Sequence, residues 1–273
     1  MTMHSEELAV SFECKGELLQ GIMHCHPAAK HGVIIVVGGP QTRHGSHRSF
    51  VQLARELNKK QINVLRFDYR GAGDSSGIIQ PFTETVNDIA SAVVFFKEMY
   101  PDIEYLSLWG LCDAASAIAM YLEHAPNKIS QVTLVNPWVK SRAIEAKTYI
   151  KFYYVQRLLS LSFWKKLFLG RVNVKQSAAD IAQFQQNAQQ TSTNNFVDSM
   201  YSGLRGFKGN IDIILSENDL TAQEFSQLIQ SNASWKKLDF HSLVLVKEAN
   251  HTLASPNWKN QLANLSINAI ISS

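Results

Sequence analysis

A cysteine at a predicted sharp turn is the residue of this chain with the clearest capacity for chemistry. The apolar run 105–109 predicts a buried strand, and the Ala-rich run 114–122 predicts a helix. Between them lies Gly110-Leu-Cys-Asp-Ala114, with Cys112 at the apex. Small residues two positions before and after the apex let strand and helix pack closely and push the apex side chain outward. The pattern indicates a nucleophile that attacks as a thiolate.

Two downstream residues strengthen this interpretation, since a short turn pattern also arises by chance and a buried cysteine is often inert. Asp219 lies in a polar loop after an apolar run that begins at Ile211, and His251 follows another apolar run that begins at Ser242. Glu217 is a competing acid in the first of these loops. Nucleophile, acid and base therefore each follow a predicted strand.

These three residue types complement one another chemically. A free thiol is mostly protonated at neutral pH, so Cys112 needs a base, and the imidazole of His251 can take its proton and later return one to a leaving group. The carboxylate of Asp219 would hold the imidazole in the required tautomer. The helix that begins after Cys112 would add the positive end of its dipole beneath the sulfur.

The rest of the chain alternates between predicted strands and helices. Residues 8–26 predict a β-hairpin with its turn at Lys15-Gly-Glu17. We expect further strands over residues 32–37, 62–69, 105–109 and 131–135, and from 211 and 242, and helices over 47–60, 83–99 and 114–122. Thr83 is the expected N-cap of the second helix. Such alternation predicts an α/β fold with a mostly parallel sheet.

The alternation stops between residues 138 and 205, a stretch far longer than an ordinary loop. Its aromatic and basic part, 149–170, is compatible with helix. We therefore expect a catalytic domain formed by 1–137 and 206–273, with 138–205 inserted after the sixth strand as a helical cap. Trp164, Lys165 and Lys166 offer an alternative role for the cap in membrane-surface contact, although packing on the catalytic domain is the simpler interpretation.

Composition narrows the function classes. The chain has 273 residues, of which 45% are hydrophobic and 18% charged, as is typical of globular proteins. A net charge of +3 without any basic block argues against nucleic acid as a partner. Three irregularly spaced cysteines, an N-terminus without a signal-peptide pattern and the lack of an apolar run of about 18 residues favour a cytoplasmic protein without a transmembrane segment. The sequence leaves the oligomeric state open.

Neither a metal nor an organic cofactor is expected. His24 and His26 alternate along one strand, but no second ligand cluster accompanies them. The glycines in 71–77 follow a strand, yet they lack the spacing of a dinucleotide-binding loop and no helix begins within them.

Taken together, these motifs resemble the α/β-hydrolase superfamily, in which nucleophile, acid and base follow one another in the order found here. A narrower resemblance is carried by Val36-Val-Gly-Gly-Pro-Gln-Thr-Arg-His-Gly-Ser-His-Arg-Ser-Phe50, Leu65-Arg-Phe-Asp-Tyr-Arg-Gly-Ala-Gly-Asp-Ser-Ser-Gly77 and Gly110-Leu-Cys-Asp-Ala-Ala-Ser116. These segments are similar to the exosortase A system-associated hydrolases, which accompany bacterial exopolysaccharide and protein-sorting loci. The chain departs from the superfamily's elbow pattern at Ala114, where a glycine is usual.

The resemblance implies further site residues. The superfamily acid usually lies late in its loop, which favours Asp219 over Glu217. The loop after the third strand usually supplies an oxyanion-hole amide, which places Gly39 in that role with the amide of Asp113 as the second donor and Gln41 as the fallback. Pro40 has no N–H to donate. Gln41 and Trp138 are expected to contact substrate. His44 and His47 lie beside the predicted site, in contact either with substrate or with solvent.

The sequence thus predicts an enzyme that hydrolyses a small ester or thioester through an acyl group on Cys112. An acyltransferase that passes the acyl group to a sugar or alcohol is an alternative, because cysteine nucleophiles on this fold occur in polyester synthases as well as in dienelactone-type hydrolases. A non-catalytic binding protein on the same fold is the second alternative. The order of the three triad residues argues against that last alternative.

Overall fold

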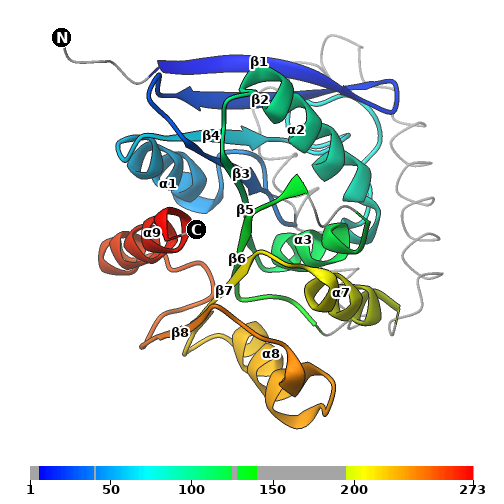
Figure 1. Ribbon diagram of the computed structural model, residues 1–273, viewed down its shortest axis with the longest axis vertical. Coiled ribbons are helices and arrows are strands. Elements are labelled where there is room, and N and C mark those ends of the chain that lie inside the picture. Colours follow the sequence, from blue (N-terminus) through cyan, green and yellow to red (C-terminus); the bar gives the residue numbers. More distant parts are fainter. Residues whose placement is uncertain (1–5, 40, 125–127, 140–194, 273) are drawn as a thin grey trace, which may run out of the picture.

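The computed structural model describes residues 6–39, 41–124, 128–139 and 195–272. An eight-stranded sheet runs through the centre of the fold (Figure 1). The strand order is β1-β2-β4-β3-β5-β6-β7-β8. The strands are β1 (Glu6–Cys14), β2 (Glu17–Cys25), β3 (His31–Val36), β4 (Ile62–Phe67), β5 (Tyr105–Leu111), β6 (Gln131–Val135), β7 (Asn210–Ser216) and β8 (Ser242–Val246). β1 and β2 pair antiparallel, as do β2 and β4, and all other pairs are parallel. This topology confirms the expected α/β-hydrolase fold.

Helices cover both faces of the sheet. The described helices are α1 (Ser49–Asn58), α2 (Val86–Met99), α3 (Asp113–His124), α7 (Asn195–Gly206), α8 (Leu220–Ser231) and α9 (Pro256–Ile271). Short 3-10 turns lie at η1 (Ser46–Arg48), η2 (Phe82–Glu84) and η4 (Trp235–Lys237). Figure 1 shows α1 and α9 on one face and α2, α3 and α7 on the other. Strands enclosed in this way are mostly apolar, and every residue of β4 and β6 is buried, including a few polar ones such as Arg66 and Gln131.

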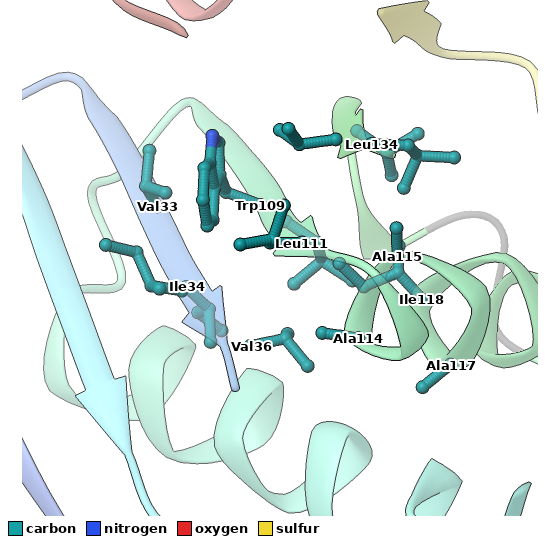
Figure 2. Close-up of a cluster of buried hydrophobic side chains, with 14 of the residues drawn as sticks. Val33, Ile34, Val36, Trp109, Leu111, Ala114, Ala115, Ala117, Ile118 and Leu134 are labelled. Carbon is teal, nitrogen blue, oxygen red and sulfur yellow. The ribbon is translucent and has the colours of Figure 1, made fainter. Parts of the chain in front are cut away.

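A cluster of buried apolar side chains lies where β3, β5 and β6 meet α3. Figure 2 shows Val33 and Ile34 of β3, Trp109 of β5 and Ile118 of α3 in this apolar cluster. α3 is buried from Asp113 through Leu122, because the sheet lies on one side of it and α7 on the other. Its alanines let these neighbours approach closely, and its buried face is mostly apolar.

Most predicted elements are confirmed, including the N-terminal hairpin and the β5–α3 turn. The prediction of Thr83 as the N-cap of the second helix is wrong. A 3-10 turn occupies Phe82–Glu84, and α2 begins only at Val86 after Thr85, whose hydroxyl donates to the Phe82 carbonyl at 2.7 Å. The Thr85 hydroxyl is thus used to close the preceding turn. Of the predicted cap, residues 140–194 lie outside the described residues.

The described C-terminal end of the predicted insertion, helix α7, packs against α3. Gly203 allows this contact, because a Cβ at that position would lie 1.9 Å from the Ala119 carbonyl oxygen and 2.9 Å from the Glu123 nitrogen. Met200 and Leu204 of α7 are buried on either side of it. The helix that carries the elbow is therefore held between the sheet and α7.

Substituting Gly203→Ala should destabilise the chain by about 1–3 kcal/mol, because the new methyl group meets the backbone of α3. Gly206→Ala in the same helix is the matched control, since a Cβ there has no atom within 4 Å. That control should stay within about 0.5 kcal/mol of wild type or gain slightly from helix propensity. Urea unfolding at one pH measures both, and equal midpoints for the two variants would contradict the close α3–α7 packing.

Candidate active site

Cys112 occupies a sharp, left-handed turn between β5 and α3. Its φ of 63° is rare for a residue with a side chain and stores strain of about 1–3 kcal/mol. Gly110 makes the turn possible, because a Cβ there would lie 2.7 Å from Ile118 Cδ1 and 2.9 Å from the Ala115 nitrogen. The Cys112 carbonyl accepts from the Ala115 and Ser116 amides at 3.1 and 3.3 Å and so starts α3. This is the geometry of a nucleophile elbow, with a helix N-terminus that favours a thiolate.

The sheet brings the other predicted residues to the same edge. β5, β6, β7 and β8 are parallel, and Cys112, Asp219 and His251 each lie just beyond the carboxyl end of one of them. Gly39 follows β3, also parallel to β5. In open α/β sheets this edge is where ligands bind.

His251 and Asp219 form a close pair. His251 Nδ1 lies 2.9 Å from Asp219 Oδ2, with the Asp219 side chain 7% exposed and that of His251 37% exposed. Asp219 also caps α8 and accepts from the Thr221 and Ala222 amides at 3.3 and 3.1 Å. Those amides orient the carboxylate, and the carboxylate binds Nδ1, so Nε2 is the nitrogen left for proton transfer.

Backbone contacts between the two loops maintain this pair. The Glu217 amide donates to the Val246 carbonyl at 3.0 Å, and the Asn218 amide donates to the Ala249 carbonyl at 2.9 Å. The exposed Glu217 side chain accepts from the Glu248 amide at 2.8 Å. Of the two acids in this loop, Asp219 is therefore the one beside His251, and Glu217 closes the loop.

Asn136, which was not among the predicted site residues, joins the ends of three strands. Its side-chain amide donates to the His251 carbonyl and to Ser216 Oγ, each at 3.0 Å. Its preceding residue, Val135, accepts from the Cys112 amide at 2.9 Å. The asparagine stands out in the sequence only as the end of an apolar run. Its partners lie 80 and 115 residues away along the chain.

Asp113 ties the elbow to the loop after β3. Its Oδ2 accepts from the Gly39 amide at 2.9 Å, and the residue is 3% exposed. A carboxylate beside Cys112 opposes ionisation of its thiol unless the carboxylate is paired, and the Gly39 N–H partly compensates this charge. The same bond means that Gly39, the predicted oxyanion donor, already has an acceptor. The fallback amide of Gln41 donates to the Gly38 carbonyl at 3.1 Å.

Trp138 lies against the elbow and belongs to an aromatic cluster. Its amide donates to Ser116 Oγ at 3.0 Å and also lies 3.4 Å from the Cys112 carbonyl. Its ring centroid is 5.2 Å from that of Phe82 and 6.2 Å from that of Phe196. Apolar surface from η2, α7 and the end of β6 therefore meets beside Cys112.

A family model described as the alpha/beta hydrolase fold matches residues 33–254. The chain belongs to the α/β-hydrolase family. No curated protein sequence matches it.

Solved structures agree with this hydrolase fold at low sequence identity. A dienelactone hydrolase from Anabaena variabilis matches with a TM-score of 0.64 and 13% identity over 98% of each chain. An esterase from Pyrococcus furiosus matches with a TM-score of 0.64 and 16% identity, over 97% of this chain and 94% of its own. An alpha-beta serine hydrolase homologue from Coxiella burnetii has a TM-score of 0.59 and 13% identity over 98% of each chain.

In this hydrolase an ion-pair network supports the loop after β3. Arg43 pairs with the buried Asp68, and its other guanidinium nitrogen lies 2.6 Å from Asp74 Oδ2. The Arg43 amide also donates to Asp68 Oδ1 at 2.6 Å. Arg66 donates to the Arg43 carbonyl at 2.6 Å. Two of the sequence motifs, 36–50 and 65–77, thus form one structural unit.

The network continues to His24 in β2. Arg66 Nε donates to His24 Nε2 at 2.9 Å, so His24 must be neutral to accept the bond. Glu7 Oε1 lies 3.7 Å from His24 Nδ1 on the far side of the ring. Burial, with Arg66 as a further cause, lowers the pKa of His24 to about 4, and burial also lowers the pKa of Arg66 to about 10.

Between residues 6 and 272, outside the gaps, no group of three or more His, Cys, Asp and Glu side chains could hold a metal ion. No helix in that same part of the chain is long and apolar enough to cross a membrane.

The buried His24 should make stability fall between pH 6.5 and 4. The unfolded imidazole takes up a proton near pH 6.5 but the folded one only near 4, so the unfolded state binds more protons in that window. His24→Gln, which keeps an oxygen for Arg66, should reduce the loss between pH 7 and 5 by on the order of 1–2 kcal/mol. Urea unfolding at both pH values measures this. His26→Gln is the control, and an unchanged pH dependence in His24→Gln would contradict a neutral folded His24.

Proposed function

We propose that this α/β-hydrolase hydrolyses an ester or thioester through an acyl group carried on Cys112. The observation that carries the proposal is the 2.9 Å pair between His251 Nδ1 and Asp219 Oδ2 at the sheet edge where Cys112 stands at a φ of 63°. A strained nucleophile, an oriented imidazole and a buried carboxylate are the three components of covalent acyl transfer.

The proposed reaction has two halves. His251 Nε2 takes the Cys112 proton, and the thiolate attacks the acyl carbonyl to form a tetrahedral intermediate. The intermediate collapses as the leaving alkoxide or thiolate takes that proton, which leaves a thioester on Cys112. Water then attacks the thioester as His251 accepts a proton. The carboxylic acid departs, and the proton returns to the Cys112 sulfur.

Gly39 and Asp113 remain the proposed oxyanion donors. The Asp113 amide lies in the first turn of α3, where helix amides point toward an incoming anion. For Gly39 the proposal requires its N–H to exchange the Asp113 carboxylate for the developing oxyanion, since that N–H is engaged at 2.9 Å. Gln41 is proposed to contact the polar part of the substrate.

An apolar acyl group is the proposed substrate feature. Trp138 lies against the elbow, and the rings of Phe82 and Phe196 pack on it. Aromatic surfaces of this kind favour apolar ligands through burial of area. The esterase and the dienelactone hydrolase that share this fold are consistent with a carbonyl substrate.

The sequence motifs also favour a function like that of the exosortase A system-associated hydrolases, which they resemble. Two of the three segments that carry this resemblance, 36–50 and 65–77, are joined by the Arg43–Asp68 pair. We propose that this unit shapes the entrance for the family's substrate.

Turnover of p-nitrophenyl esters and acyl thioesters should fall roughly 10⁴-fold in Cys112→Ala and His251→Ala, and roughly 10³- to 10⁴-fold in Asp219→Asn. His241→Ala is the matched control, because His241 Nδ1 also lies 3.0 Å from a buried aspartate, Asp212, but at the opposite edge of the sheet.

His241→Ala should retain turnover near the wild-type rate. Equal losses in His251→Ala and His241→Ala would indicate a general effect of removing a His–Asp pair. Full turnover in Cys112→Ala would contradict the covalent route.

A further inference from the structure

Asn136 has every polar atom of its side chain engaged, although it is completely buried. Its Oδ1 accepts from the Ser216 amide at 2.8 Å, and its Nδ2 donates to Ser216 Oγ and to the His251 carbonyl, each at 3.0 Å. These partners also determine the orientation of the amide, because the Ser216 N–H needs an acceptor and the His251 carbonyl needs a donor. A buried amide with all its bonds made holds its neighbours in one arrangement.

The backbone of Asn136 is equally constrained. Its φ is 45°, in the left-handed region, where asparagine is more readily accommodated than most residues. Its amide donates to the Ile214 carbonyl of β7 at 2.9 Å. β6 therefore ends in a bend that turns this side chain toward β7 and the His251 loop.

Consecutive residues consequently hold the two reacting partners. Val135 accepts from the Cys112 amide, and Asn136 donates to the His251 carbonyl. The His251 loop needs such an anchor, because Glu248 and Leu253 on either side of His251 both have positive φ, at 57° and 47°. The pair with Asp219 holds the ring at Nδ1, whereas Asn136 holds the main chain from which the ring extends.

We propose that Asn136 is a positioning residue that holds His251 in reach of Cys112. The proposal rests on the proposed function, because it assigns Asn136 a role only if His251 serves Cys112. Asn136 acts through the His251 backbone and does not touch the substrate. Its loss should therefore weaken the coupling between imidazole and thiol more than it weakens substrate binding.

The test measures the rate at which iodoacetamide alkylates Cys112 in the full chain as a function of pH. Peptide mapping separates this cysteine from Cys14 and Cys25. The rate follows the thiolate fraction, and a nearby imidazolium lowers the thiol pKa. Asn136→Asp keeps the acceptor for Ser216 but turns an oxygen toward the His251 carbonyl, and Asn136→Gly keeps the left-handed backbone.

Asn58→Asp is the matched control. Asn58 is 2% exposed, and its Nδ2 donates to the Ile62 carbonyl at 3.1 Å, so this substitution also turns a buried carboxyl oxygen toward a backbone carbonyl. It lies at the end of α1, away from the sheet edge that carries Cys112. Any effect of a buried carboxyl group on stability alone should appear in this control as well.

We expect both Asn136 variants to shift the alkylation profile toward that of His251→Ala and to lower kcat for p-nitrophenyl butyrate by roughly 10- to 100-fold with little change in KM. Asn58→Asp should keep the wild-type profile. Folded Asn136 variants with a wild-type profile and kcat would overturn the positioning role.

Two further outcomes are decisive. If both Asn136 variants unfold while Asn58→Asp folds, Asn136 serves the fold itself and the assignment is overturned. If His251→Ala leaves the wild-type profile unchanged, His251 does not serve Cys112, and the proposed function falls together with the positioning role.

Discussion

The site depends on the hydrogen bonds that join the carboxyl ends of β5, β6, β7 and β8. The Cys112 amide is held by the end of β6, and Asn136, one residue beyond that end, holds β7 and the His251 loop. Because each of these strands is hydrogen-bonded to its neighbour in a fixed register up to its carboxyl end, a shift of one strand would displace the groups beyond it at this edge. The strained turn at Cys112 persists because α3, buried along nearly its whole length, is packed against α7 and the sheet.

Two opposite electrostatic effects act on the Cys112 thiol at the elbow. A thiolate benefits from the N-terminus of α3, whereas the Asp113 carboxylate beside it has the opposite effect. The structure pairs that carboxylate with the Gly39 amide at 2.9 Å, and in doing so joins the β3 loop to the elbow. The Arg43–Asp68 pair secures the same loop from its other side. Two carboxylates thus hold the β3 loop, and one of them engages the Gly39 amide beside Cys112.

The fold could be predicted because its determinants are local. Apolar runs such as 131–135 and the turn at Cys112 are visible over five to ten residues, and the structure contains them where the sequence indicated. The N-cap prediction at Thr83 failed because a 3-10 turn precedes α2, and short patterns do not distinguish a helix start from such a turn. Residues 140–194, which hold most of the predicted cap, lie outside the described part of the chain.

The site was only partly predictable, since its supporting contacts span long stretches of sequence. Cys112, Asp219 and His251 could be selected because each follows a strand pattern, and the structure places Asp219 beside His251. Asn136 could not be selected, because its bonds to Ser216 and His251 require the strand order to be known. The bond of the Asp113 carboxylate was equally hidden, since its partner Gly39 lies 74 residues earlier.

The most direct test of the account is to mix the protein with an activated ester, quench it rapidly, measure its intact mass and map any acyl adduct. The account predicts one acyl group on Cys112. This adduct should accumulate further in His251→Ala, because acylation by an ester with a good leaving group proceeds without the base while deacylation needs it. An adduct on Cys14 or Cys25 would contradict the assignment of the nucleophile. Turnover with no adduct on Cys112 under any quench time would contradict the covalent mechanism.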